Sequence, residues 1–196
     1  MNPVELAIAK RVRLPALMAR SRGRAEITVA LIDGPVVLDH PDLAGATIRE
    51  VSGKLIGTCA RADTVACMHA TFVAGILSAR RGSVAPAICP GCTLLVRPIF
   101  AEAWNSGWIP SASPVELAEA IIDSVDSSAR VINLSSAFLQ TAPKGETRLE
   151  EALNHAARHG AITVAAAGNQ GTVGSSAITR HPRVIPVAAC NIQGRR

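Results

Sequence analysis

An imidazole interrupts a stretch of small and apolar residues at His69, in 66-ACMHATFVAGIL-77. Three roles are open to a histidine in such a place: a core residue with a satisfied hydrogen bond, a metal ligand, or a general base. A core histidine is the commonest of the three when the residue is taken alone. The choice therefore depends on which other residues could act together with His69.

Metal binding would use Cys67, His69, Cys89 and Cys92, which are spaced as C-x-H followed by C-x-x-C. This spacing superficially resembles the signature of zinc deaminases, whose chemistry needs a glutamate two residues after the histidine. Thr71 occupies that position, so only a structural zinc site stays open. Our prediction is that the chain holds no metal and no cofactor.

Nucleophilic hydrolysis would instead combine His69 with an acid and a serine. Asp33 ends one apolar run, Ser135 and Ser136 end another, and Asn169 follows a third. If these runs are parallel strands, their polar ends meet at the carboxyl edge of the sheet, where α/β proteins gather their catalytic groups. Asp33 would fix the tautomer of His69 while the imidazole takes a proton from a serine. The set favours a catalytic role for His69.

The elements that must position these residues follow from apolar periodicity. Short continuous apolar runs predict buried strands at 27–33, 93–100, 130–136, 161–168 and 183–190. Helical spacing predicts helices at 69–81, at 114–127 with Ser113 as the cap, and at 147–159. Strands that alternate with helices of this length predict βαβ units and a doubly wound parallel sheet.

Four segments, in order along the chain, resemble the subtilisin-like serine proteases (the subtilase family, peptidase S8). The segments 28-TVALIDGPVVLDHPDLAG-45 and 69-HATFVAGILSA-79 resemble those of the family's catalytic aspartate and histidine. The segments 131-VINLSSAF-138 and 164-VAAAGNQG-171 resemble the strand that lines the substrate cleft and the segment of the oxyanion asparagine. Within the family, 86-PAICPGCTLLVRPIF-100 and the lead-in LPALMARSRG are similar to the cyanobactin-maturation subtilases.

The resemblance implies a subtilisin-like three-layer α/β/α sandwich with a mostly parallel sheet. Residues 1–24 would form a helical, basic segment, and residues 25–196 the N-terminal portion of the subtilase core. Asp33 would be the orienting acid, His69 the general base and Asn169 the oxyanion donor. The substrate backbone would be bound by Ser135, Ser136, Ala137 and Gly168. The implied activity is that of a serine-type endopeptidase that processes a ribosomal precursor peptide.

The chain departs from the family pattern in ways that bear on activity. Ala70 and Phe72 replace a glycine and a second histidine of the histidine helix. No Gly-Thr-Ser-Met-Ala-type nucleophile segment is found, and 174-GSSA-177 is followed by TRHP rather than by a helical pattern. Asp42 matches a family calcium ligand but lacks evident partners, so we predict no bound calcium.

We therefore expect a sheet that is truncated on its C-terminal side and a catalytic serine that is missing from these residues. A second chain, or sequence outside these residues, would supply that serine, and the substrate would be a peptide or protein. The alternative is an inactive pseudoprotease that binds an extended peptide or a partner chain.

The amino-acid composition indicates the size of the domain, its partners and its location. The 196 residues are 48% hydrophobic but include only three Phe, two Trp and no Tyr, which suits one domain of helices packed closely on a sheet. The basic run at 10–24 lacks the aromatic residues that stack on bases, so no nucleic-acid partner is predicted. No apolar run is long enough to span a membrane, no signal peptide is recognisable, and five cysteines agree with a reducing compartment. A cytoplasmic location is predicted, and the pairing of Cys59 with Cys67 is left open.

Overall fold

The computed structural model describes residues 10–102, 111–135, 143–168, 176–191 and 193–195. Its elements, in chain order, are α2 (Leu14–Arg20), β1 (Thr28–Asp33), the short 3₁₀ helix η1 (Pro41–Leu43), β2 (Thr47–Glu50), α3 (Val65–Ser78), β3 (Thr93–Pro98), α4 (Pro114–Asp126), β4 (Val131–Leu134), α5 (Pro143–Arg158), β5 (Ile162–Ala166), α6 (Ala177–Arg180) and β6 (Val184–Val187).

The strands form one six-stranded sheet in the order β2-β3-β1-β4-β5-β6. Every neighbouring pair is parallel, which confirms the predicted doubly wound parallel sheet. The central strand β1 is buried along its whole length, and it ends at Asp33. On one side of β1 the sheet continues with β3 and β2, and on the other side with β4, β5 and β6. Asp33 therefore lies at the point where the strand order reverses, and parallel sheets bind their ligands at such points.

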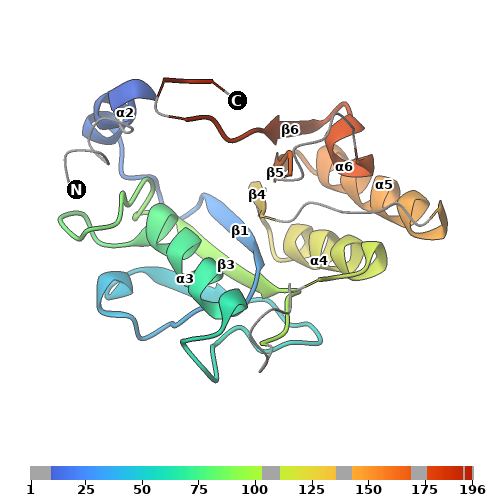
Figure 1. Cartoon of the computed structure of the whole chain (residues 1–196), viewed down its shortest axis with the longest axis horizontal. Coiled ribbons are helices and arrows are strands. Elements are labelled where there is room, and N and C mark those ends of the chain that lie inside the picture. The colour runs from blue at the N-terminus through green and yellow to red at the C-terminus, as the bar shows by residue number, and fades with distance from the viewer. Residues whose placement is uncertain (1–9, 103–110, 136–142, 169–175, 192, 196) are drawn as a thin grey trace.

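Helices cover the two faces of the sheet unequally (Figure 1). On one face, α4, α5 and α6 pack over Ile32, Leu95 and Ile132. On the other face, α3 packs over Leu31, Leu94 and Val96. The side chains that α3 turns toward the sheet include Ala70 and Ala74, and their small size lets the helix approach the strands closely.

Half of the α3 face has no helix over it among the described residues. Leu31 of β1, which α3 covers, belongs to a row of residues in register across the sheet. The row continues through Asn133 of β4, Val164 of β5 and Ile185 of β6. Residues in register on adjacent strands point to the same face of a sheet. Ile162, Ile185 and Val187 of this face are each 52% exposed. The structure thus has an apolar sheet surface directly beside α3.

Some elements differ from those predicted. Helix α3 begins at Val65, four residues earlier than expected, because Thr64 caps it by accepting a hydrogen bond from the backbone N–H of Cys67. Strand β2 was not predicted, since it lies at the sheet edge with two charged residues and no buried side chain. The predicted cap of α4 is confirmed: Ser113 and Glu116 form a reciprocal capping box.

The basic N-terminal arm is held against the rest of the molecule by backbone contacts. None of the side chains of α2 is buried. The guanidinium of Arg81 donates hydrogen bonds to the carbonyl oxygens of Met18 and Ser21, and the N–H of Gly91 donates to the carbonyl oxygen of Arg22. Among the described residues, no helix has the length and apolar character that crossing a membrane requires.

Candidate active site

Asp33 is a buried carboxylate at the carboxyl end of the central strand. Its side chain is 1% exposed, and Oδ1 accepts a hydrogen bond of 2.8 Å from the backbone N–H of Gly34. The Asp33 carbonyl oxygen accepts a further 2.8 Å bond from the N–H of Ile99, which follows β3. Gly34 is required here because a Cβ at this position would lie 2.4 Å from the carbonyl oxygen of Ala66. The first turn of α3 therefore rests directly on the Asp33–Gly34 backbone.

His69 lies in the second turn of α3 and reaches toward this carboxylate. Its Nδ1 is 2.9 Å from Asp33 Oδ1, and its side chain is 52% exposed. A carboxylate only accepts hydrogen bonds, so Nδ1 carries the proton and Nε2 is the basic nitrogen of the neutral ring. The hydrogen bond that His69 donates to Asp33 raises the pKa of His69 above its ordinary value, and burial of the ring lowers that pKa by a smaller amount. The pair can therefore accept a proton at His69 Nε2, on a ring that solvent or a substrate can reach.

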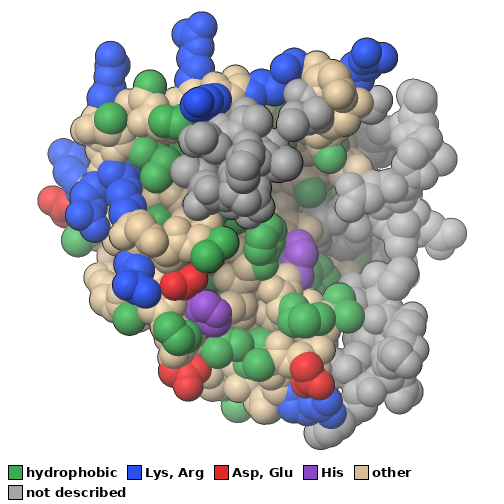
Figure 2. Space-filling view, turned by 60° about the vertical axis from the view of Figure 1, so that its left-hand side comes forward, with side chains coloured by type: hydrophobic (Ala, Val, Ile, Leu, Met, Phe, Trp, Pro, Cys, Tyr) green, Lys and Arg blue, Asp and Glu red, His purple; other side chains and the backbone are tan. Residues whose placement is uncertain are grey.

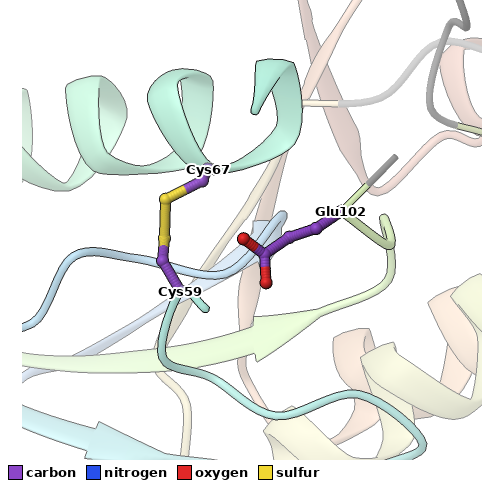
Figure 3. Close-up of side chains that lie close together, drawn as sticks. All are labelled: Cys59, Cys67 and Glu102. Carbon is purple, nitrogen blue, oxygen red and sulfur yellow. A yellow bond between two sulfur atoms is a disulfide. The ribbon is translucent and has the colours of Figure 1, made fainter. Parts of the chain in front are cut away.

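Three contacts fix the start of the helix that carries His69. Thr64 caps α3, and a disulfide joins Cys59, in the preceding loop, to Cys67 in the first turn. Glu102, which follows β3, accepts hydrogen bonds of 2.9 and 2.8 Å from the backbone N–H groups of Ala60 and Arg61. Figure 3 shows the Glu102 carboxylate pointing toward the disulfide. Sequence reasoning missed Glu102, because nothing near it in the chain signals these contacts.

The other residues predicted for the site are only partly described. Ser135 lies half-buried just after β4, and its hydroxyl oxygen accepts a 2.9 Å hydrogen bond from the side-chain amide of Asn133. Gly168 lies just after β5 with φ of 102°, a conformation that favours glycine. Because β4 and β5 are neighbours, the two residues share the carboxyl edge of the sheet with Asp33. Ser136, Ala137 and Asn169 lie outside the described residues.

Ser176, in the segment that most resembles a nucleophile turn by its letters, has another role. Its hydroxyl accepts a 3.2 Å hydrogen bond from the backbone N–H of Thr179 and so caps α6. Ile178 of that helix is buried in the core formed with α4 and α5, on the face of the sheet opposite α3. Ser176 thus caps a helix that packs on the face of the sheet opposite α3, the helix that carries His69.

The four residues considered for a structural zinc site do not converge. Cys67 lies in the first turn of α3 and forms a disulfide with Cys59. Cys89 lies near the other end of the helix, where its N–H donates to the carbonyl oxygen of Leu77 in the last turn of α3. At 1.5 Å per residue, the helical stretch from Cys67 to Leu77 spans about 15 Å. Asp42, the residue that matches a family calcium ligand, lies 3.8 Å from Arg80 in an ion pair.

Two cavities adjoin the helix that carries His69. One, of about 380 Å³, lies between the loops that follow β1 and β3 and the loop that precedes α3; its lining includes Pro35, Lys54, Ile56, Phe100 and Glu102. The other, of about 690 Å³, is more apolar and lies against Met68, Phe72 and Ile76 of α3. Figure 2 shows hydrophobic side chains exposed on this side of the molecule, with basic side chains along its border. Sequence reasoning predicted neither cavity.

Comparison with known proteins identifies a family and several similar proteins. The family profile described as "Subtilase family" matches residues 24–194. Subtilisin amylosacchariticus of Bacillus subtilis subsp. amylosacchariticus is 28% identical over 198 residues, which cover 94% of this chain and 46% of the relative. This chain thus spans about half the length of the curated relatives that it matches first.

Solved structures give the same result for the fold. The structure of the prenylagaramide maturation protease PagA matches with a TM-score of 0.78 and 30% identity, over 92% of this chain and 60% of that one. A mutant of the protease domain of PatA matches with a TM-score of 0.76 and 29% identity, over 88% of this chain and 61% of that one. The predicted three-layer fold is therefore confirmed, for a chain that spans about three fifths of these structures.

Proposed function

Because the chain belongs to the subtilase family, we propose that it carries the acid–base part of a serine-type endopeptidase. The observation that carries this proposal is the 2.9 Å contact between His69 Nδ1 and Asp33 Oδ1 at the carboxyl edge of the sheet. A buried acid that holds a solvent-accessible imidazole is the arrangement that activates a serine hydroxyl.

In the proposed reaction, His69 Nε2 takes the proton of a serine hydroxyl as the oxygen attacks the peptide carbonyl carbon. Asp33 keeps the ring in the required tautomer and stabilises the imidazolium that forms. Asn169 donates a hydrogen bond to the oxyanion, a contact whose loss typically costs roughly 10²–10³ in turnover. His69 then passes its proton to the leaving amine, and water releases the acyl group by the same steps.

The serine would come from a segment outside these residues, either further along the same polypeptide or in a second chain. The uncovered apolar surface of β4, β5 and β6 supports this proposal, because it lies beside α3 on the face toward which Asp33 and His69 are turned. An element packed on that surface would complete the third layer of the domain and would lie next to His69.

The proposed substrate is an extended peptide, and specifically a ribosomal precursor peptide. Ser135, Ser136, Ala137 and Gly168 would bind its backbone at the ends of β4 and β5, in the manner of an added strand. The 30% identity with PagA, which is named as a maturation protease, supports the precursor class of substrate. The 380 Å³ cavity, whose lining includes Phe100, a residue that donates its N–H to the carbonyl oxygen of Asp33, would receive a substrate side chain.

A fluorophosphonate probe tests the function, because it labels only an activated serine. The full polypeptide, or its complex with the chain that supplies the serine, should be labelled. His69→Ala should abolish labelling, and Asp33→Asn should slow peptide cleavage by about 10⁴-fold. His159→Ala, at an exposed histidine whose ring donates only to its own helix, should leave both unchanged.

A pseudoprotease would give a different set of results. It would remain unlabelled in every form while still binding the precursor peptide, and Asp33→Asn would not change that affinity. Labelling that persists in His69→Ala would also contradict the proposed role of the histidine.

A further inference from the structure

Three side chains that take no part in the proposed proton transfers meet beside the start of α3. The Sγ atoms of Cys59 and Cys67 and a carboxylate oxygen of Glu102 all lie within 4.8 Å of one another (Figure 3). In the part of the chain that the structure describes, this is the one cluster of three or more His, Cys, Asp or Glu side chains spaced to hold a single metal ion. Its members come from a loop, a helix and the segment after β3.

The fold positions each of the three independently of the bond between the sulfurs. Cys67 belongs to the first turn of α3, whose cap is Thr64. Cys59 is held by the hydrogen bond from its N–H to the carbonyl oxygen of Val36. Glu102 is fixed by the N–H groups of Ala60 and Arg61, which orient its carboxylate. Outer contacts of this kind are what aligns a metal ligand before the ion binds.

The three side chains are close enough for a thiophilic cation once the disulfide is reduced and its two sulfurs can separate. Zinc binds sulfur at about 2.3 Å and carboxylate oxygen at about 2.0–2.2 Å in tetrahedral geometry, so its ligand atoms stand roughly 3.5–3.8 Å apart. The start of a helix also favours the thiolate form of a cysteine, which is the form that binds metal. Glu102 lines the 380 Å³ cavity, which gives an ion a path from solvent.

We propose that the Cys59–Cys67 disulfide closes a metal site, and that its reduction allows Cys59, Cys67 and Glu102 to bind one zinc ion. A dithiol reduces the disulfide by exchange: it becomes a cyclic disulfide, and Cys59 and Cys67 become thiols. Zinc then displaces one proton from each thiol, so two protons leave as the ion binds, and water takes the fourth position.

The ion would replace the disulfide as the tie between the loop and the helix. In both states Cys59 remains linked to Cys67, two residues before His69, so α3 keeps its position under oxidising and under reducing conditions. This inference does not depend on the proposed proteolysis, since none of the three residues transfers a proton in that reaction, although Glu102 also lines the cavity proposed for a substrate side chain.

Cobalt(II) titration of the full polypeptide tests the site, with zinc used to displace the cobalt. Protein reduced with a phosphine should bind one cobalt ion and show tetrahedral d–d bands together with thiolate charge-transfer absorption. Zinc X-ray absorption should report two sulfur ligands, and binding should release two protons. The disulfide form of the same protein should bind no ion at this site.

Variants identify the ligands. Cys59→Ser should lower the intensity of the thiolate charge-transfer band, because only one sulfur ligand remains, and it should weaken zinc binding. Glu102→Gln should weaken zinc binding by about tenfold or more. The matched control is the Cys89→Ser/Cys92→Ser double variant, which removes the other cysteine pair and should bind zinc unchanged. The proposal would be overturned if the disulfide form bound the ion, if the control variant lost binding, or if Glu102→Gln left binding unaltered. A count of sulfur ligands other than two in the wild-type protein would also overturn it.

Discussion

At the scale of single residues, the hydrogen bond between Asp33 and His69 determines which protonation state of the imidazole the fold favours. The buried carboxylate raises the pKa of His69, and burial of the ring opposes this to a smaller extent. The imidazolium form is thereby stabilised, which is the form that His69 must adopt during the proposed reaction. The ring nevertheless stays half-exposed, so solvent and substrate can exchange protons with it.

Asp33→Asn should lower the pKa of His69. The amide carries no charge, so it removes the interaction that favours the imidazolium and leaves the opposing effect of burial. NMR titration of the histidine ring protons measures the change. The ring-proton signals of His159, an exposed histidine just after α5, provide the internal control and should be the same in both proteins. An unshifted His69 would show that Asp33 does not set its charge.

The same contact should make stability depend on pH in a defined direction. A group whose pKa is higher in the folded state contributes stability that is fully present below its unfolded value, about 6.5 for histidine. That contribution is lost as the pH rises through the higher folded pKa. The difference in unfolding free energy between wild type and His69→Gln should therefore be larger at pH 5.5 than at pH 8.5. Urea denaturation at the two pH values measures it, and a difference that grows with pH would contradict the assignment.

At the scale of elements, α3 connects the loop contacts at Thr64, Cys59 and Glu102 to the position of His69. The apolar periodicity of residues 69–81 revealed the helix but not its start, because the residues that precede His69 are ordered by contacts distant in sequence. The cap at Thr64 lacks the glutamate three residues later and the proline that mark Ser113 as a cap, and the sequence leaves the pairing of Cys59 with Cys67 open. The proximity of Asp33 and His69 could thus be predicted, whereas the loop contacts that fix the start of α3 could not.

Thr64→Ala should destabilise the protein by about 1 kcal/mol, the usual cost of a lost helix cap. Because α3 carries His69, the ring-proton shifts of His69 should change as well. Thr64→Ser keeps the capping hydroxyl and should restore both. The matched comparison is Ser113→Ala, which removes the cap of α4 and should cost a similar free energy while leaving His69 unchanged. Urea denaturation and NMR provide the two readouts.

A second prediction at this scale concerns the buried ion pair that joins β3 to α4. Arg97 is 5% exposed and donates hydrogen bonds of 2.8 and 3.0 Å to Asp123, which is 38% exposed. Asp123→Ala would leave a buried guanidinium without its acid, so it should cost about 2–3 kcal/mol, slightly below the usual range for a fully buried pair. Glu119→Ala, which removes an exposed pair with Lys54, should change stability by less than about 1 kcal/mol. Equal costs for the two variants, measured by urea denaturation, would contradict this reasoning.

At the scale of the whole molecule, the strands of the sheet interior were the most predictable features. Strands β1 and β3 are buried on both faces, and each is a continuous apolar run in the sequence. Strand β2 and helix α6 were missed for the opposite reason, since the first lies exposed at the sheet edge and the second spans only four residues. The expectation of a truncated sheet corresponds to the apolar surface left exposed on β4, β5 and β6.

The proposal that a further element covers this exposed surface can be tested at Ile185. Ile185 is 52% exposed in these residues, and the proposed covering element would bury it. Ile185→Thr keeps a β-branched side chain but places a hydroxyl there. It should therefore change the stability of the 196-residue chain by no more than about 0.5 kcal/mol, and that of the full polypeptide or complex by about 1–3 kcal/mol. Val12→Thr, at an exposed valine of the basic arm, should be neutral in both. Equal effects of Ile185→Thr in the two forms, measured by thermal and urea unfolding, would mean that nothing covers this face and that the catalytic serine must approach His69 by another route.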